Sequence, residues 1–344
     1  MSLDSLISRQ EQIATGQIKA LPIPKYQRYT VCNLRGGIGK TSLVFNLSYL
    51  ADDMLVVDTC PQGNLSYFYD NNYYSHLSTS VYDMLLPYMM PGLGHASRVA
   101  QKVSASNIHF TGKNTFFLPS SDQLYVLPTQ MANALAQAKT ITGNQKIQII
   151  DRMLYSLKYE IDREMKETDT KRCLIDTSPF FSGATHLAWH ASDALIIPVR
   201  TDQQSINSLS LLLNMLSNPA SEFRLTMPSD LHAPKIQLIV LTHCGWSTRK
   251  GARNEPNQQT KIYLEQVRDI VNRNITSFTT NNPDNHIVLL DDFLGSGRIS
   301  TAQSKPMELL NAGETMMINR VKTEVNQAVE KVKKQLNFIN QSIW

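Results

Sequence analysis

Apolar residues lie along the chain in short continuous runs, and segments with helical spacing separate these runs. Continuous apolar runs are typical of strands that helices cover on both faces of a parallel sheet. Apolar residues three and four positions apart are typical of helices that lie on such a sheet. The pattern predicts an α/β fold, a mostly parallel twisted sheet with helices on both faces. The expected strands include 29–34, 54–58, 172–176, 194–199, 235–241 and 286–290, and the expected helices include 43–50, 145–166, 205–216 and 260–274.

The composition is that of a globular protein, with 344 residues of which 42% are hydrophobic and 18% are charged. No apolar run reaches the ~18–20 residues of a membrane span, and the N-terminus lacks the apolar core of a signal peptide. We therefore expect a cytoplasmic protein. The expected organisation is a polar leader over 1–25 and a single domain over 26–344, with a helical elaboration at about 65–170 and an amphipathic C-terminal helix at about 315–340.

A glycine-rich turn, Arg35–Ser42, joins the first expected strand to the helix after it. Its sequence R-G-G-I-G-K-T-S is shorter than the G-x-x-x-x-G-K-[ST] pattern, but the strand–turn–helix setting is that of a phosphate loop. Backbone N–H groups of such a turn and the dipole of the following helix favour a phosphate. Lys40 is expected to reach the β- and γ-phosphates, and the Thr41 hydroxyl to bind Mg²⁺. The alternative is a glycine-rich turn with a chance lysine. The expected nucleotide-binding residues are Gly36, Gly37, Ile38, Gly39, Lys40, Thr41 and Ser42.

Two expected strands end in carboxylates, Asp58 and Asp176. Ligands of a parallel sheet bind at the carboxyl ends of its strands, so both side chains are expected beside the phosphate loop. Asp176 is the expected second carboxylate of a nucleotide site, which holds Mg²⁺ through water. An Asp at the end of a strand can also be a helix cap or a turn former, and this alternative stays open for either residue.

Three segments resemble the nucleotide motifs of the ParA/MinD family of deviant Walker ATPases, in the order and spacing of that family: Arg35–Ser42, Asp58–Asn64 and Leu174–Pro179. Residues 192–199 resemble the family's next strand, and residues 291–300 lie where the family contacts the purine. The sequence Pro-Gln-Gly-Asn over 61–64 is most similar to the ParA branch. The resemblance therefore implies a P-loop NTPase fold of the deviant Walker type, with Asp291 and Phe293 in the nucleotide site.

The resemblance implies ATP and Mg²⁺ as cofactors, a homodimer that encloses ATP, weak hydrolysis and non-specific DNA binding. It also implies a ParB-like adaptor or another cargo protein as partner, in plasmid or chromosome partition and in association with the nucleoid. Arg35 matches the family's signature lysine, which reaches the phosphates of the partner, and Asp58 matches the first Asp of its motif. Arg35, Lys40 and Asp58 are thus the implied catalytic residues. Membrane-binding members end in a basic, apolar helix that residues 337–344 do not resemble.

Cys60 departs from the family pattern, because an Asp that helps to position the attacking water stands at this position in the family. A thiol is a poor replacement, since it is a weak acceptor unless ionised. We expect slow or differently assisted hydrolysis. A nucleotide-gated scaffold that never turns over, and a metabolic or metal-cluster-carrier ATPase, are the alternatives. The four cysteines show no metal-site or C-x-x-C spacing, which argues against the cluster carriers.

Positive charge is concentrated late in the chain, although the net charge is only +4. Residues 244–273 contain six basic and three acidic residues, and residues 320–344 contain five and two. Such segments suit the phosphate backbone of DNA, while a solvated loop is the alternative. The expected DNA-binding residues are Arg249, Lys250 and Arg253 in a loop, and Lys322, Lys331, Lys333 and Lys334 on the polar side of the last helix.

Overall fold

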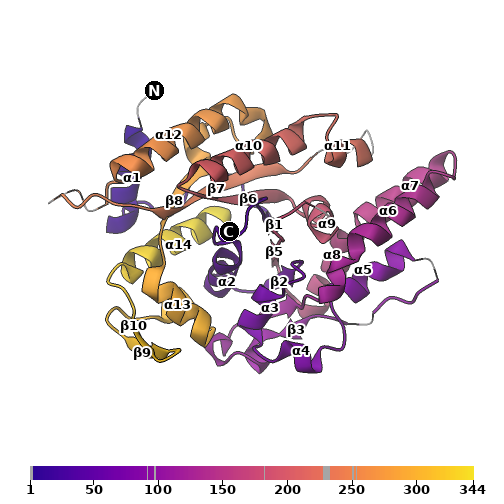
Figure 1. Ribbon diagram of the computed structural model, residues 1–344, viewed down its shortest axis with the longest axis horizontal. Helices are drawn as coiled ribbons and strands as arrows, with labels where there is room; N and C mark the ends of the chain where they lie inside the picture. Colours follow the sequence, from indigo (N-terminus) through magenta and orange to yellow (C-terminus); the bar gives the residue numbers. More distant parts are fainter. Residues whose placement is uncertain are drawn as a thin grey trace.

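A twisted, mostly parallel β-sheet is the centre of the computed structural model, which describes residues 3–90, 92–96, 98–181, 183–227, 233–249, 252 and 254–344. Within these residues the sheet has eight strands in the order β3-β4-β2-β5-β1-β6-β7-β8, all parallel except the short edge strand β3 (Figure 1). This topology confirms the α/β prediction. The strands are β1 (Arg28–Val31), β2 (Met54–Asp58), β3 (Gln101–Lys102), β4 (Thr115–Leu118), β5 (Arg172–Asp176), β6 (Ala194–Arg200), β7 (Lys235–Cys244) and β8 (Ile287–Asp291).

Helices cover both faces of this sheet, because successive strand residues point to opposite sides. On β2, Val56 packs with α2 and α14 on one face, whereas Leu55 and Val57 pack with α5, α8 and α9 on the other. Helices α10 and α12 continue this second face over β6 and β7. The helices are α1 (Asp4–Thr15), α2 (Lys40–Leu50), α3 (Asn64–Tyr69), α4 (Tyr73–His76), α5 (Val81–Met89), α6 (Leu127–Ala138), α7 (Asn144–Leu154), α8 (Ser156–Thr168), α9 (Ala184–Ala191), α10 (Gln203–Ser217), α11 (Glu222–Thr226), α12 (Gln258–Arg273), α13 (Leu294–Gln303) and α14 (Val329–Ile343).

The segment expected as a polar leader contains helix α1, which packs against α14 and β8 (Figure 1). Its apolar residues Leu6 and Ile13 are buried. Arg9 is also buried, and its guanidinium donates to the carbonyl oxygens of Asp284 and Ile287. These contacts join the start of the chain to the edge of the sheet formed by β8.

The expected elaboration between 65 and 170 combines helices with the strands β3 and β4 at one edge of the sheet. The single helix expected over 145–166 is two helices, α7 and α8, which meet at Tyr155. Helix α8 lies on the sheet and buries Leu157 and Ile161, while α7 projects beside α6 away from it (Figure 1). The apolar spacing continues through both helices, so it did not reveal the change of direction.

The helix expected over 315–340 is wrong in its first part, because residues 315–324 form an antiparallel hairpin of β9 (Thr315–Ile318) and β10 (Val321–Glu324). Asn319 and Arg320 between the strands both have positive φ, +48° and +66°, which is the backbone of a two-residue hairpin turn. Helix α14 begins only at Val329 and buries Val332, Leu336 and Ile339. No helix within the described ranges is long and apolar enough to cross a bilayer.

Candidate functional site

The phosphate loop lies between the end of β1 and the start of α2, at the middle of the sheet. Gly37 and Gly39 have φ of +69° and +91°, a region that side chains with a Cβ rarely adopt, so the turn requires glycine there. Lys40 Nζ donates to the Arg35 carbonyl oxygen at 2.7 Å, which folds the side chain back over the loop. Burial lowers the pKa of Lys40, and the nearby carboxylate of Asp176 opposes this shift.

Thr41 and Asp176 form the centre of the site, because β5 is the neighbour of β1 and ends beside the loop. Thr41 Oγ1 donates to Asp176 Oδ2 at 2.7 Å. Asp176 is fully buried, and its Oδ1 has no hydrogen-bond partner among the described residues. Burial and the charge of Asp58 raise the pKa of Asp176 to about 7. A hydroxyl and an unsatisfied carboxylate beside a phosphate loop suit a hard divalent cation, which prefers oxygen ligands.

Asp58 is opposite Asp176 in the sheet, but its carboxylate is engaged in the turn that follows β2. Oδ1 accepts from the N–H of Cys60 at 3.1 Å, and Oδ2 accepts from the N–H and the hydroxyl of Ser66, each at 2.8 Å. Burial raises the pKa of Asp58 despite these hydrogen bonds. The contacts are those of a turn former, the alternative that the sequence left open.

Cys60 lies in the same turn and is 6% exposed. Burial and the neighbouring Asp58 raise the pKa of the Cys60 thiol to about 11, so the thiol is neutral near pH 7. A neutral thiol is a weak hydrogen-bond acceptor and a poor base. The side chain at this position therefore cannot orient or deprotonate a water as a carboxylate would.

Arg35 forms an ion pair with Asp202 and donates to the Ser205 hydroxyl at 2.7 Å. Asp202 is also the N-cap of α10, where it accepts from the Ser205 N–H. Although burial opposes the shift, the bonds from Ser205 and Arg35 lower the pKa of Asp202. Sequence reasoning missed Asp202, whose one signal was an Asp directly before a helix.

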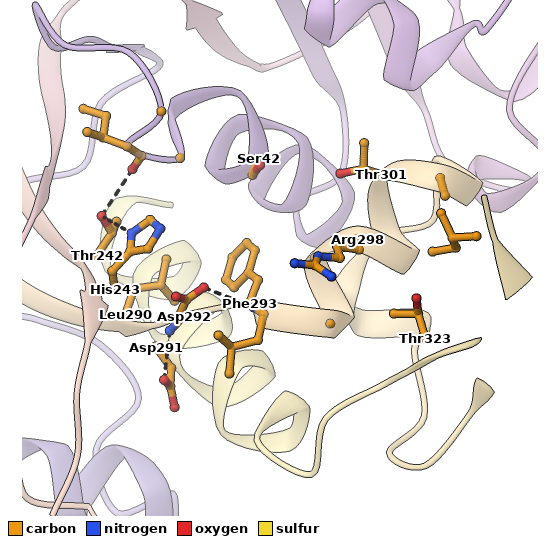
Figure 2. Close-up of a pocket in the computed structure, with 18 of the residues that line it drawn as sticks. Ser42, Thr242, His243, Leu290, Asp291, Asp292, Phe293, Arg298, Thr301 and Thr323 are labelled. Carbon is orange, nitrogen blue, oxygen red and sulfur yellow. Dashed lines mark hydrogen bonds between the residues drawn. The ribbon is translucent and has the colours of Figure 1, made fainter. Parts of the chain in front are cut away.

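A cavity of about 1140 Å³ extends from the phosphate loop to α13 and the β9–β10 hairpin (Figure 2). Six of the predicted nucleotide residues line it: Gly37, Ile38, Gly39, Ser42, Asp291 and Phe293. Lining residues that the sequence analysis missed include Thr242, His243, Arg298, Thr301 and Thr323. The pairing of β7 with β8 shifts register between Leu241 and Cys244, and His243 there has a φ of +57°. A bulge of this kind re-aims a side chain, and no pattern in the sequence announces it.

The predicted basic surface of the last helix belongs only in part to that helix, and its lysines there have partners within the chain. Lys322 lies on β10 and not on a helix. Lys331 Nζ lies 3.0 Å from the centre of the Trp246 ring, and burial lowers its pKa to about 8. Lys333 pairs with Glu330 at 2.9 Å, and Lys334 donates to the Ala14 carbonyl oxygen at 2.5 Å. Lys331 and Lys334 thus contact neighbouring parts of the chain, whereas the Lys333 ion pair lies within α14, and a contact of these lysines with DNA stays a prediction.

The loop after β7 contains the remaining predicted DNA-binding residues. Arg249 is exposed, and its backbone N–H donates to the Ser247 hydroxyl at 3.2 Å. Lys250 and Arg253 lie outside the described residues.

The sheet order, the glycine-rich loop and the Thr41–Asp176 pair together define a P-loop nucleotide hydrolase fold. The family model described as an AAA domain matches residues 27–227, and the chain belongs to this family of ParA/MinD-like P-loop ATPases. The resemblance inferred from the three sequence motifs is thereby confirmed.

Solved structures with the same fold include McdA from Cyanothece. The ATP complex of a McdA variant has a TM-score of 0.57 at 17% identity, over 91% of this chain and 96% of that chain. Apo McdA has a TM-score of 0.56 at 16% identity, over 81% and 91%. A protein from Corynebacterium diphtheriae has a TM-score of 0.53 at 13% identity, over 81% and 96%. At such identities the likeness shows the fold.

Two curated relatives are uncharacterised proteins from two strains of Mycobacterium tuberculosis. Each is 27% identical over 188 residues, which is 53% of this chain and 49% of the relative. The chain therefore spans about half the length of the curated relatives it matches.

Proposed function

We propose that the protein is an ATP- and Mg²⁺-dependent, ParA-like ATPase that positions a cargo. The observation that supports this most is the Thr41–Asp176 pair beside the phosphate loop, with one buried Asp176 oxygen left unsatisfied. Thr41 and Asp176 would hold Mg²⁺, and phosphate oxygens and water would supply its other ligands. The cation would neutralise charge on the transferred phosphoryl group, while Lys40 and the loop amides bind the β- and γ-phosphates.

Dimerisation is the second part of the proposal. Arg35 would leave Asp202 and donate to the phosphates that the partner subunit holds, as the family's signature lysine does. Its ion pair with Asp202 is partly exposed, with 27% and 31% of the two side chains accessible. Such a pair is worth about 0–1 kcal/mol, so a phosphate can displace it at low cost. Arginine also offers a planar fork that matches phosphate oxygens.

Non-specific DNA binding and an adaptor partner complete the proposal, and both follow from the family resemblance. Exposed Arg249 and Lys322 support the DNA contact. Contacts to backbone phosphates carry no sequence information, so the binding would be sequence-blind and salt-dependent.

A nucleotide-gated scaffold with little turnover is a second candidate, because the neutral thiol of Cys60 stands where the family has a carboxylate. Such a protein would switch between nucleotide states without a hydrolytic cycle. The two candidates share the site and differ in the rate of hydrolysis.

Turnover of ATP by the full chain tests the proposal, with Mg²⁺ and DNA present, and with and without the suspected adaptor. We expect Cys60→Asp to raise the rate at least tenfold, because a positioned base contributes about 10²–10⁴-fold. Cys60→Ser is the matched control, since a hydroxyl of similar size brings no carboxylate and leaves the rate low.

The outcomes separate the candidates. ATP binding with negligible turnover that Cys60→Asp restores favours the scaffold for the native chain. Native turnover that DNA or the adaptor stimulates favours the cycling ATPase. A native chain that binds no ATP in the presence of Mg²⁺ contradicts both.

A further inference from the structure

Backbone contacts close the base of the loop that follows β7. Trp246 forms a β-bridge with Pro256, and the Ser247 N–H donates to the Glu255 carbonyl oxygen at 2.8 Å. The two ends of the loop therefore run side by side between β7 and α12. Exposed Arg249, which supports the proposed DNA contact, lies three residues after Trp246. The position of the base of the loop therefore decides where the Arg249 guanidinium lies.

Lys331 of α14 contacts this base from the side of the domain. Its Nζ lies 3.0 Å from the centre of the Trp246 ring. An indole is the strongest aromatic partner of a cation, and the contact strengthens when the cation is desolvated. Burial lowers the pKa of Lys331 to about 8. The groups that face Lys331 and oppose this shift are Asp291 on β8, Cys244 on β7 and Glu11 on α1.

Asp291 joins this contact to the cavity. It lines the cavity at the end of β8 (Figure 2), and α14 packs beside that strand (Figure 1). Its backbone N–H donates to Oε1 of the buried Gln335 at 2.9 Å, about one helical turn after Lys331 on α14. Burial raises the pKa of Asp291, whereas Trp246 and Lys331 oppose this shift. Asp291 therefore borders the cavity and interacts with both members of the cation–ring pair.

We propose that Lys331 is a positioning residue, which holds the loop after β7 through Trp246 and links the position of that loop to the occupancy of the cavity through Asp291. The inference rests on the proposed function, because it needs a ligand in the cavity and a use for the loop. The ring and the carboxylate attract the same ammonium group. A ligand that contacts Asp291 changes the attraction of the carboxylate, so the ammonium and the ring take a different relative position. By linkage, a partner that binds the loop changes the affinity of the cavity for its ligand by the same factor.

Fluorescence of the full chain with Mg²⁺ and ATP tests the link to the cavity in the absence of DNA. The signal of Trp246 is the difference between each protein and the same protein with Trp246→Phe, because Trp189 and Trp344 remain in both. ATP should change this signal in the native chain and in Lys331→Arg, which keeps a cation over the ring, and not in Lys331→Met. Lys334→Met is the control and should keep the change, since Lys334 is a cation of the same helix that contacts α1 instead.

The pH dependence of this signal separates the ammonium group from its aliphatic stem. Because the pKa of Lys331 is about 8, the native signal should be lost between about pH 7 and pH 9. Arginine stays charged, so Lys331→Arg should keep the signal over the same range. Lys40 and the rest of the site are identical in the two proteins, so a change in ATP binding itself would affect both profiles. Equal pH profiles would overturn the role of the ammonium group.

Retention on DNA with ATP tests the role of the loop. Trp246→Leu and Lys331→Met should each weaken it about tenfold at unchanged ATP affinity, the size expected for a desolvated cation–π contact. Trp246→Leu changes no charge, so its effect cannot come from a lost contact between Lys331 and a phosphate. Lys331→Met should add little to Arg249→Glu, because both act through one loop, whereas the effects of independent contacts would add.

A native chain that binds ATP with no change in the Trp246 signal would overturn the inference and leave the proposed function intact. Unchanged retention in Trp246→Leu, or additive losses in the double variant, would overturn the positioning role as well. A native chain that shows the signal but no retention on DNA would overturn the DNA part of the proposed function, and the role of the loop with it. Failure to bind ATP would overturn the proposed function itself, and the inference with it.

Discussion

A buried carboxylate oxygen without a partner, such as Oδ1 of Asp176, is costly in a folded protein unless a proton or a cation satisfies it. A proton satisfies it below the raised pKa of Asp176, which burial and Asp58 set to about 7. A divalent cation would satisfy it above that pH. Asp176 thereby links the stability of the fold to the binding of a proton and to the binding of a divalent cation.

The pH dependence of stability follows from this shift. The folded protein binds the Asp176 proton more tightly than the unfolded chain does, so this contribution is present at low pH and is lost as the pH rises from 3.8 to about 7. Without Mg²⁺ and nucleotide, we expect the free energy of unfolding to fall in this window by up to about 1.4 kcal/mol per pH unit from this group.

Urea denaturation at several pH values, with Asp176→Asn as the comparison, measures this effect. The variant cannot ionise at this position, so its stability should decline less with pH. Parallel pH profiles of the two proteins would contradict the assignment. Addition of Mg²⁺ and ATP should stabilise the native chain most at the upper end of the window.

Sequence reasoning identified the residues whose chemistry a local motif encodes, and missed those that tertiary structure supplies. Lys40, Thr41 and Asp176 follow from a strand, a turn and a charged strand end. Arg298 lies in the segment 291–300 that the resemblance indicated, but it was not singled out, because its place in the cavity depends on the docking of α13. A partner such as Asp202 is 167 residues from Arg35 along the chain, beyond any local pattern.

At the scale of elements, the turn from β2 to α3 depends on a glycine. Gly63 is the N-cap of α3 with a φ of +62°, and a Cβ there would lie 1.6 Å from the Tyr73 hydroxyl oxygen. Tyr73 is 1% exposed and its ring packs on that of Tyr74, so a shift of its hydroxyl would disturb packed neighbours. We expect Gly63→Ala to lower the free energy of unfolding by about 2–4 kcal/mol, from positive φ and overpacking together.

Gly112→Ala is the matched control for this substitution. Gly112 has a φ of +83°, and a Cβ there would have no atom within 4 Å. It should therefore show only the backbone cost of about 1 kcal/mol. Chemical denaturation of the two variants measures the difference, and equal losses would show that the contact with Tyr73 is unimportant.

Element types were predictable where the periodicity of apolar residues was sustained. The predictions failed where the chain turns sharply. The central strands and helix α12 match their expected ranges within a few residues. The hairpin did not, because Val321 and Val325 fit a helical stripe although Val321 is 61% exposed on β10. Asn319 and Arg320 have the positive φ values that reverse the chain there. Neither residue is a glycine, so the sequence did not indicate the turn.

For the whole molecule, the distribution of charge differs from the expected one, since Lys322 lies on the hairpin and the lysines of α14 have partners within the chain. Arg249 in the loop after β7 and Lys322 on β10 are exposed, and they remain candidates for an electrostatic contact with DNA. We expect Arg249→Glu to reduce ATP-dependent retention on DNA without changing ATP affinity. If Arg249 contacts one phosphate, the slope of log K against log salt should become shallower by about 0.9.

Lys139→Glu is the control, because Lys139 is an exposed cation next to α6, in the part of the molecule that projects from the sheet (Figure 1). The same change of charge there should leave DNA retention as it is. Equal losses for the two variants would attribute the effect to net charge. Unaltered retention in Arg249→Glu would place the DNA elsewhere.

The contacts of Arg9 affect whether the edge of the sheet can pair with a strand of another molecule. β8 is the last strand of the sheet, and an edge strand offers unpaired backbone groups that can recruit another chain. Arg9 occupies the Ile287 carbonyl oxygen on that strand, and α1 lies alongside. The Arg9 guanidinium satisfies one backbone acceptor of this edge and so removes part of the template for strand addition. Helix α1 thus covers part of an edge strand, and its detachment would expose backbone groups that can pair with another chain.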